Sequence, residues 1–529
     1  MEPVNPLHLP EILGYMARYL SQNDQVQCLR VCKSWQETIE PLVWNELFIN
    51  KGPSTRVPAP NILQIHRHQV TLLHIDLNAS PLYMSEYPKL HTLSIIMDCE
   101  EGMDVMDLER NAMDLVHCNP SLVCLKIRDL RPSIGAGFWS PISQLLPRLR
   151  SIVLHFGSMS GKETIEAFWN ACTTLESLVV VTLRFENDGA EREEGDNSND
   201  DDNDVAMSEE EYFGGVVSSP TMIFPRLCTL QLYGVVGMDE VEQLSLFSQC
   251  PQLQCLTWHW KPQCESTTAR WVGEQLVRRI GSRAAWPHLR RVNLYPQDAM
   301  LQDQDLSQLM NGMEPANELC FPGSGFGPVA FQALRRHFDQ LQELTLSDGR
   351  LVTSPMLQEI LCSCPSLTIL RGESLQAKDI VQGTPWVCLQ LKTLLIGFVF
   401  EKDEDHLQPR VFACLSRLSR LEFLHIGCKE RHHVVHQDSL DCRLQSGLGS
   451  LIDLRVLAHF SISGTRQALS PTEVEWMVAH WTCLEAVYGN LSTDTSTNVK
   501  LRKLLQASLR SKSSRWHPPP SPSCRVNDA

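Results

Sequence analysis

The stretch LQELTL, Leu341–Leu346, consists of a leucine, two variable residues, an apolar residue, one variable residue and a second apolar residue. Its last three positions alternate between apolar and polar side chains, as a short strand with one buried face requires. The same phrase recurs along most of the chain. A recurrence of this kind indicates a repeat architecture, in which a hydrophobic core is built by stacking neighbouring repeats.

Most neighbouring copies of the phrase lie about 24 to 36 residues apart, which predicts roughly 12 to 15 repeats. The other clear copies are LHTLSI (Leu90–Ile95), LVCLKI (Leu122–Ile127), LRSIVL (Leu149–Leu154), LESLVV (Leu175–Val180), LCTLQL (Leu227–Leu232), LQCLTW (Leu253–Trp258), LRRVNL (Leu289–Leu294), LKTLLI (Leu391–Ile396) and LEFLHI (Leu421–Ile426). Degenerate copies are LTILRG (Leu367–Gly372) and LRVLAH (Leu454–His459).

The residues between copies have helical spacing. In SPMLQEILCSCPSL, Met356, Ile360 and Leu361 share one helical face before Pro365 ends the helix. Alternating strands and helices predict an α/β fold in which the repeats stack into a curved solenoid with a parallel sheet on its concave side. The pattern resembles leucine-rich repeats. The helix ends HCNPSL, QCPQL and SCPSL resemble the cysteine-containing subclass, although the asparagine usual after the strand is mostly missing.

Variable strand residues of such a solenoid are expected to face the concave side, where a partner protein could bind. The alternative is that most of these positions are merely solvated. The candidate target-binding residues are Tyr233, His259, Tyr295, Ser347 and His425, accompanied by Gln231, Thr257, Asn293 and Thr345.

Three amphipathic helices are expected before the repeats. LHLPEILGYMARYL, residues 7–20, places Ile12, Leu13, Met16 and Leu20 on one helical stripe. A second stripe comes from Val26, Leu29 and Cys32, and a third helix from Trp35, Ile39, Leu42 and Trp44. A core built from three short helices is thin for an independent domain, so a partner is expected.

The string LPEIL, then RVCKSW (Arg30–Trp35) and LVW (Leu42–Trp44), resembles the F-box. F-boxes dock substrate receptors of cullin–RING ubiquitin ligases on a Skp-type adaptor. The resemblance covers residues 5–48, and Glu11 follows Pro10 directly where many F-boxes have an intervening residue. The layout looks like fungal F-box-like proteins. The resemblance implies that the adaptor contacts Leu9, Pro10, Ile12, Leu13, Val31, Cys32 and Trp35.

The net charge of −16 is distributed unevenly. Residues 186–211 hold thirteen acidic residues and one arginine, net −12, so the rest of the chain carries only −4. Such a segment buries too little apolar surface to offset its ordering entropy, and a disordered insertion is expected at 186–213. It could instead bind a basic partner or carry phosphorylation at Ser198 and Ser208. No basic face with interleaved aromatic residues indicates nucleic-acid binding.

No catalytic, cofactor or metal site is expected. The chain lacks a P-loop, a GxGxxG after a strand and a GxSxG elbow, and the glycine-rich FPGSGFGP, Phe321–Pro328, is interpreted as a turn between repeats. His432 and His436 in CKERHHVVH could share a metal on a helix, but an exposed polar segment is the simpler interpretation. The nineteen cysteines lie mostly in apolar contexts and are expected to be buried thiols.

The predicted organisation is an F-box-like domain at 1–48, a linker at 49–69, a solenoid at 70–504 and a disordered tail at 505–529. The start lacks a secretory pattern and no apolar run reaches the length of a membrane span, so a cytoplasmic or nuclear protein is expected. We expect a non-catalytic substrate receptor, monomeric within the complex, that binds the adaptor, through it cullin, and a target protein. The alternative is an interaction scaffold without a role in ubiquitin ligation.

Overall fold

The computed structural model describes residues 9–49, 57–77, 85–98, 105–131, 134–186, 222–260, 266–281, 286–296, 301–347, 349, 351–427 and 439–513. The chain divides into two compact units, residues 1–253 with 518–529, and residues 254–517. Several predicted features lie outside the described residues. These are most of the acidic insertion, with Ser198 and Ser208, the histidine pair His432 and His436, and the end of the tail.

The first unit begins with three helices that share a small core. They are α1 (Pro10–Ala17), α2 (Gln22–Cys28) and α3 (Lys33–Asn45). Leu13 and Ala17 pack against Ile39 and Val43, and smaller contributions come from Val26, Cys28, Leu29, Trp35 and Leu42. The side chain of Ser21 accepts a hydrogen bond from the amide of Asp24 and so caps α2 at its N-terminus.

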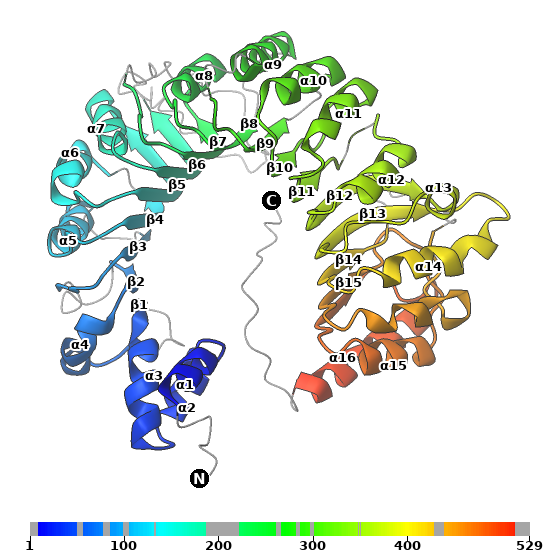
Figure 1. Ribbon diagram of the computed structural model, residues 1–529. Helices are drawn as coiled ribbons and strands as arrows, with labels where there is room; N and C mark the ends of the chain where they lie inside the picture. Colours follow the sequence, from blue (N-terminus) through cyan, green and yellow to red (C-terminus); the bar gives the residue numbers. More distant parts are fainter. Residues whose placement is uncertain are drawn as a thin grey trace, which may run out of the picture. The chain divides into compact units, whose positions relative to one another are not determined.

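Seven parallel strands follow in the described part of the first unit, each paired with its neighbour in chain order. They are β1 (Glu46–Ile49), β2 (Leu72–Asp76), β3 (Thr92–Asp98), β4 (Cys124–Arg131), β5 (Ser151–Ser160), β6 (Ser177–Glu186) and β7 (Thr229–Val236). The helices of this part are α4 (Pro60–His66), η2 (Arg67–Gln69), α5 (Val105–His117), α6 (Ala136–Leu145), α7 (Lys162–Cys172) and α8 (Glu240–Ser248). In Figure 1, α5, α6 and α7 lie on the outer side of this sheet.

The second unit repeats the arrangement with nine described strands. They are β8 (Cys255–Trp260), β9 (Arg291–Pro296), β10 (Glu318–Cys320), β11 (Glu343–Thr345), β12 (Ile369–Gln376), β13 (Thr393–Val399), β14 (Phe423–His425), β15 (His459–Ser461) and β16 (Ala486–Tyr488). Its helices are α9 (Ser266–Gly281), α10 (Asp303–Gly312), α11 (Pro328–Leu334), η4 (Arg335–His337), α12 (Ser354–Ser363), α13 (Ala377–Gln382), η5 (Asp405–Leu407), α14 (Gln408–Ser416), η6 (Leu444–Ser446), η7 (Leu448–Asp453), α15 (Pro471–His480) and α16 (Thr495–Ser513).

The leucine phrase builds the core of both units. The central apolar residue of each strand pairs in register with that of the next, as Leu319, Leu344 and Leu370 do, and all three are fully buried. Burying a leucine side chain contributes roughly 1.5–3 kcal/mol. The repeated ladder therefore stabilises each strand against its two neighbours. The prediction of an α/β solenoid with a parallel sheet is confirmed.

Elements also occur where the sequence predicts none. The expected linker at 49–69 includes α4 and η2, and β1 already pairs in parallel with β2 at Glu46↔Leu72. The last helix, α16, runs to Ser513, beyond the expected end of the solenoid. None of the described helices is long and apolar enough to cross a membrane.

At two helix ends the cysteine thiols are buried, as the repeat pattern predicts. Cys250 and Cys364 are fully buried, and the Cys250 thiol donates a hydrogen bond to the carbonyl of Leu246 at 3.3 Å. Burial raises the pKa of Cys250 to about 12, so this thiol stays protonated and unreactive. All cysteines in the described part of the chain are free, and Cys32 and Cys483 are exposed.

Candidate functional site

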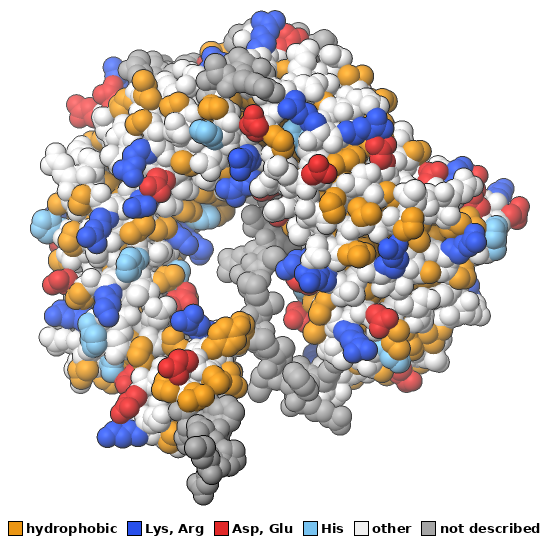
Figure 2. All heavy atoms as spheres, in the orientation of Figure 1, with side chains coloured by type: hydrophobic (Ala, Val, Ile, Leu, Met, Phe, Trp, Pro, Cys, Tyr) orange, Lys and Arg blue, Asp and Glu red, His pale blue; other side chains and the backbone are white. Residues whose placement is uncertain are grey.

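Helix α1, together with the residues that flank it, exposes an apolar face that the three-helix core does not use. We call Leu9, Ile12, Tyr15, Met16 and Tyr19 the apolar α1 face. Leu9 is 41% exposed, Ile12 39% and Tyr15 63%. The rings of Tyr15 and Tyr19 meet edge to face at 5.2 Å, and the Tyr19 hydroxyl donates to the Tyr15 hydroxyl at 2.7 Å. Figure 2 shows hydrophobic side chains gathered over these N-terminal helices.

The opposite side of α1 is buried, so the helix is apolar almost all round. Leu13 is 3% exposed and Ala17 is fully buried in the three-helix core. A helix that is hydrophobic all round is typically covered on every side. The exposed half of α1 therefore indicates a protein partner.

The predicted adaptor-contact residues divide into an exposed and a packed group. Leu9, Pro10, Ile12, Val31 and Cys32 are exposed, with Val31 at 60%. Leu13 and half-buried Trp35 pack in the same hydrophobic cluster. The two packed residues hold the helices together, while the exposed ones are accessible to a partner.

Sequence reasoning missed the two tyrosines of the apolar α1 face. It placed Ile12 and Leu13 on one stripe, whereas the structure turns Leu13 inward and Ile12 outward. The spacing of residues 9, 12, 16 and 19 matches one helical face. That spacing could have revealed the exposed face once Leu13 and Ala17 were assigned to the core.

The candidate target-binding residues fall in both units. Tyr233 lies on β7 of the first unit, and the other four lie in the second. His259 and Tyr295 meet edge to face at 5.6 Å, and burial lowers the pKa of His259. His425 Nδ1 lies 2.7 Å from the Ser461 hydroxyl. Ser347 is buried, and its carbonyl accepts a hydrogen bond from the amide of Gly323.

A small polar hollow of about 50 Å³ lies on strands β9 to β12 of the second unit. We call it the concave hollow. Its lining residues are Asn293, Tyr295, Glu318, Leu319, Cys320, Glu343, Thr345, Ile369 and Arg371. Three of them, Asn293, Tyr295 and Thr345, belong to the positions that the sequence predicts to face a partner. The two glutamates and the arginine were not predicted.

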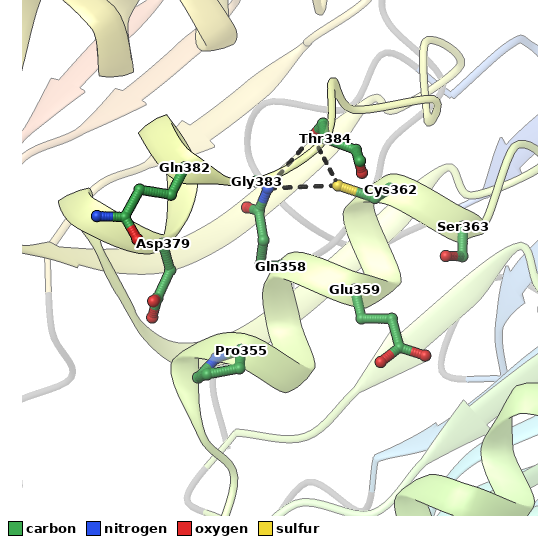
Figure 3. Close-up of a pocket in the computed structure, with 9 residues that line it drawn as sticks. All are labelled: Pro355, Gln358, Glu359, Cys362, Ser363, Asp379, Gln382, Gly383 and Thr384. Atoms are coloured by element: carbon green, nitrogen blue, oxygen red, sulfur yellow. Dashed lines mark hydrogen bonds between the residues drawn. The ribbon is translucent and has the colours of Figure 1, made fainter.

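A larger hollow of about 370 Å³ lies on the outer side of the second unit, between α12 and α13 (Figure 3). Three of its lining residues, Gln358, Cys362 and Thr384, bond to one another. The Cys362 thiol donates to the carbonyl of Thr384 at 2.9 Å, and Gln358 Nε2 donates to the same carbonyl at 3.4 Å. Trp386 Nε1 donates to Gln358 Oε1 at 3.0 Å. These bonds are typical of a packing seam between two repeats.

The glycine-rich loop before α11 has an intramolecular partner. Both carboxylate oxygens of Asp303, at the start of α10, accept hydrogen bonds from backbone amides at the start of α11. The donors are Gly327 and Ala330 to Oδ1 at 2.9 and 2.7 Å, and Val329 to Oδ2 at 2.9 Å. A neighbouring carboxylate thus occupies the amides that a phosphate would need, as expected for a turn between repeats.

No group of His, Cys, Asp and Glu residues that could hold a metal ion occurs among the described residues. The polar groups of the second unit are instead arranged for hydrogen bonding along the inner face of its sheet. Among the described residues, the apolar α1 face and the concave hollow are two surfaces with groups available to a partner.

Residues 9–50 match the model of the F-box-like family. No curated protein shows a significant match to the sequence. Among solved structures, the chain is similar to an internalin (inlF) from Listeria monocytogenes, with 11% identity and a TM-score of 0.36 over 74% of this chain and 86% of that chain. It is also similar to the complex of Rad7 and Elc1 in yeast, with 13% identity and a TM-score of 0.40 over 74% of this chain and 90% of that chain. The N-terminal helices are an F-box-like domain.

Proposed function

We propose that this chain, an F-box-like domain followed by a leucine-rich-repeat solenoid, is the substrate-recognition subunit of an SCF-type ubiquitin ligase. The F-box-like domain docks on a Skp-type adaptor, which brings cullin, and the solenoid binds a target protein. The observation that carries this proposal is the exposed apolar α1 face within the region that matches the F-box-like model. We also propose that it acts in the cytoplasm or the nucleus.

The proposed role requires no catalytic side chain in this chain. Holding the target and the ligase in one complex raises the effective concentration of target lysines near the transferred ubiquitin. Adaptor affinity would come from apolar burial, because each large side chain that leaves water contributes roughly 1.5–3 kcal/mol when fully buried. Ile12, Tyr15 and Met16 are the strongest contributors that α1 offers.

The test is quantitative co-purification of the full chain with the adaptor and cullin, scored by mass spectrometry. Ile12→Asp combined with Met16→Asp places two charges on the apolar α1 face and leaves the core residues unchanged. The matched control is Ile62→Asp with Ile65→Asp, because these isoleucines of α4 are also exposed. We expect stoichiometric recovery of both partners with the unaltered chain and the control, and loss of both with the α1 variant. Recovery of neither partner by the folded, unaltered chain would contradict the proposal.

A second function, an interaction scaffold without ubiquitin ligation, is favoured by one observation. The helices lead directly into β1, and Gln22 Nε2 donates hydrogen bonds to the carbonyls of Val43 and Glu46, at 3.1 Å each. Repeat arrays need caps at their ends, and these helices could serve as one. Recovery of the adaptor without cullin supports the scaffold.

A further inference from the structure

The concave hollow places two carboxylates side by side on the sheet. Glu318 of β10 and Glu343 of β11 are direct register partners, and both side chains line the hollow. Within the described part of the chain, the Glu318 carboxylate accepts one hydrogen bond, from Asn293 Nδ2 at 2.5 Å, and the Glu343 side chain has no hydrogen bond or ion pair. Like charges directly opposite each other on neighbouring strands are destabilising. The pair therefore needs compensation from elsewhere.

The neighbouring arginines compensate only partly. Burial and the negative charge of Glu318 raise the pKa of Glu343, whereas the positive charges of Arg371 and Arg291 lower it. The resulting pKa is still above its ordinary value. The two arginines therefore do not fully compensate the negative charge of the Glu343 carboxylate.

Asn293 supplies an independent sign that a ligand is missing. Its side chain is 8% exposed, and its Oδ1 atom has no hydrogen-bond partner among the described residues. A carboxylate only accepts hydrogen bonds, so the Nδ2 group must face Glu318, which leaves Oδ1 as the free acceptor. A buried acceptor without a partner costs about 1–3 kcal/mol. A donor that enters the hollow would recover this cost.

Arg371 of β12 also lines the hollow and is its one cationic residue. Its Nε atom is buried and has no acceptor in the described part of the chain. Cys320 also lines the hollow, and its side chain is hydrogen-bonded to Tyr295 and Thr345. The hollow therefore presents three acceptor groups, Glu318, Glu343 and Asn293 Oδ1, beside one buried donor without an acceptor.

We propose that the concave hollow binds the ammonium group of a lysine side chain in the target protein. The three acceptor groups match the three N–H donors of an ammonium. A hollow of about 50 Å³ can hold a group of the size of a water molecule, whereas a planar guanidinium is larger. This inference rests on the proposed role of the solenoid in target binding.

An anionic group fits the hollow less well. A phosphate or carboxylate would meet Arg371 but would also lie against Glu318 and Glu343, and it could not donate a hydrogen bond to Asn293 Oδ1. The favoured target segment is therefore basic, and acetylation of its lysine would remove the charge that the two carboxylates attract.

The test measures peptide binding to the purified full chain by fluorescence anisotropy. The probe is a fluorescein-labelled peptide of Gly-Ala-Lys repeats, compared with peptides in which every lysine is replaced by acetyl-lysine or by arginine. Glu318→Gln with Glu343→Gln removes the two charges of the hollow. Glu314→Gln with Glu475→Gln removes two charges from exposed glutamates elsewhere in the same unit and is the matched control.

We expect the hollow variant to weaken binding of the lysine peptide about tenfold, because charge-assisted hydrogen bonds are lost. The control variant is expected to bind within about twofold of the unaltered chain, and acetylation to abolish the difference between the variants. Equal affinities of the two double variants, tighter binding of the arginine peptide, or no binding of the lysine peptide by the unaltered chain would each overturn the proposal.

Co-purification with the adaptor separates this inference from the proposed function. The hollow variant is expected to recover the adaptor as the unaltered chain does, and a far-UV circular-dichroism spectrum equal to that of the unaltered chain shows that its second unit folds. Loss of lysine-peptide binding with intact adaptor recovery supports both. Failure of the unaltered chain to recover the adaptor refutes the ligase role. The peptide measurement tests lysine binding by the hollow independently of the adaptor.

Discussion

Trp35 shows how packing and partner binding can share one side chain. It is half-buried against the cluster of Leu13, Ala17, Ile39 and Val43. The sequence predicts the presence of this tryptophan in the helical core and, through the F-box resemblance, at the adaptor contact. Its intermediate exposure is compatible with both roles, because part of the ring remains accessible.

We expect Trp35→Ala to weaken adaptor binding by about 2 kcal/mol or more, as aromatic anchors at interfaces commonly do. Isothermal titration of the purified adaptor into the full chain measures this loss. Trp35→Phe is the control, because it keeps an aromatic ring in the core. An unchanged affinity for a Trp35→Ala variant with normal helical content would show that the ring is packing only.

His337 illustrates a buried residue whose role the sequence does not reveal. It is fully buried in η4, accepts a hydrogen bond from the amide of Ala316 at Nδ1 and donates from Nε2 to the carbonyl of Met310. These two bonds fix the neutral tautomer. Burial lowers the pKa of His337 from 6.5 to about 4.

This shift predicts a loss of stability in mild acid. A lowered folded-state pKa means that the unfolded chain binds the proton first, so the stabilisation is present above pH 6.5 and is lost as the pH falls towards about 4. The full difference is about 3 kcal/mol. We expect hydrogen-exchange protection of β10 to fall between pH 7.5 and 5 in the unaltered chain, and to fall less in His337→Gln. An equal pH dependence in both chains would contradict this.

At the scale of elements, the sequence predicts most strands but not all of their lengths. The leucine phrase locates β11 well, because apolar alternation defines a short strand. In contrast, β5 and β6 continue well beyond the phrase, to Ser160 and Glu186. They do so through Phe156 and Thr182, at φ values of 52° and 54°. No glycine marks these left-handed positions, so the sequence gives no signal of the turn within each strand.

The same limit applies to the candidate sites. The polar strand positions Asn293, Tyr295 and Thr345 were predictable from alternation. Glu318 and Glu343 meet only because their strands pair in register, which requires knowing the repeat boundaries on both sides. For α1, helical spacing predicts two apolar faces but does not say which one packs inward.

The contact between Asp303 and α11 gives a prediction at the scale of neighbouring repeats. We expect Asp303→Ala to destabilise the start of α11 by about 1–2 kcal/mol, because three amides lose their acceptor. Hydrogen exchange read at Val329 and Ala330 measures the change. Asp305→Ala is the matched control, because Asp305 caps α10 by accepting from the amide of Gln302. Unchanged exchange at α11 in Asp303→Ala would contradict the capping role.

For the whole molecule, the sequence predicts which modules are combined but does not predict which target protein is bound. The N-terminal match and the repeats together support an adaptor role, because each module has a recognisable pattern. A target is recognised by a few polar groups that different repeats bring together. The lysine-binding hollow therefore emerges only from the register of four strands.

A repeat array also makes a prediction about how far a local change spreads. Each repeat contacts mainly its neighbours, so stability is roughly a sum of repeat and nearest-neighbour contributions. Deleting residues 1–45 removes α1 to α3 but keeps β1. The deletion also removes the hydrogen bonds that Gln22 donates to the carbonyls of Val43 and Glu46. We expect hydrogen-exchange protection to fall about tenfold in β1 and β2, which corresponds to about 1.4 kcal/mol.

Under the same deletion, strands β8 to β16 are expected to keep their protection, because the missing helices belong to the first unit. Full-chain hydrogen exchange followed by mass spectrometry resolves both regions in one experiment. Ile12→Asp with Met16→Asp serves as the comparison, because it alters the apolar α1 face but keeps the cap. A loss of protection that extends to β8–β16 would mean that the two units unfold cooperatively. Unchanged protection of β1 and β2 would instead mean that the helices serve the partner and do not cap the sheet.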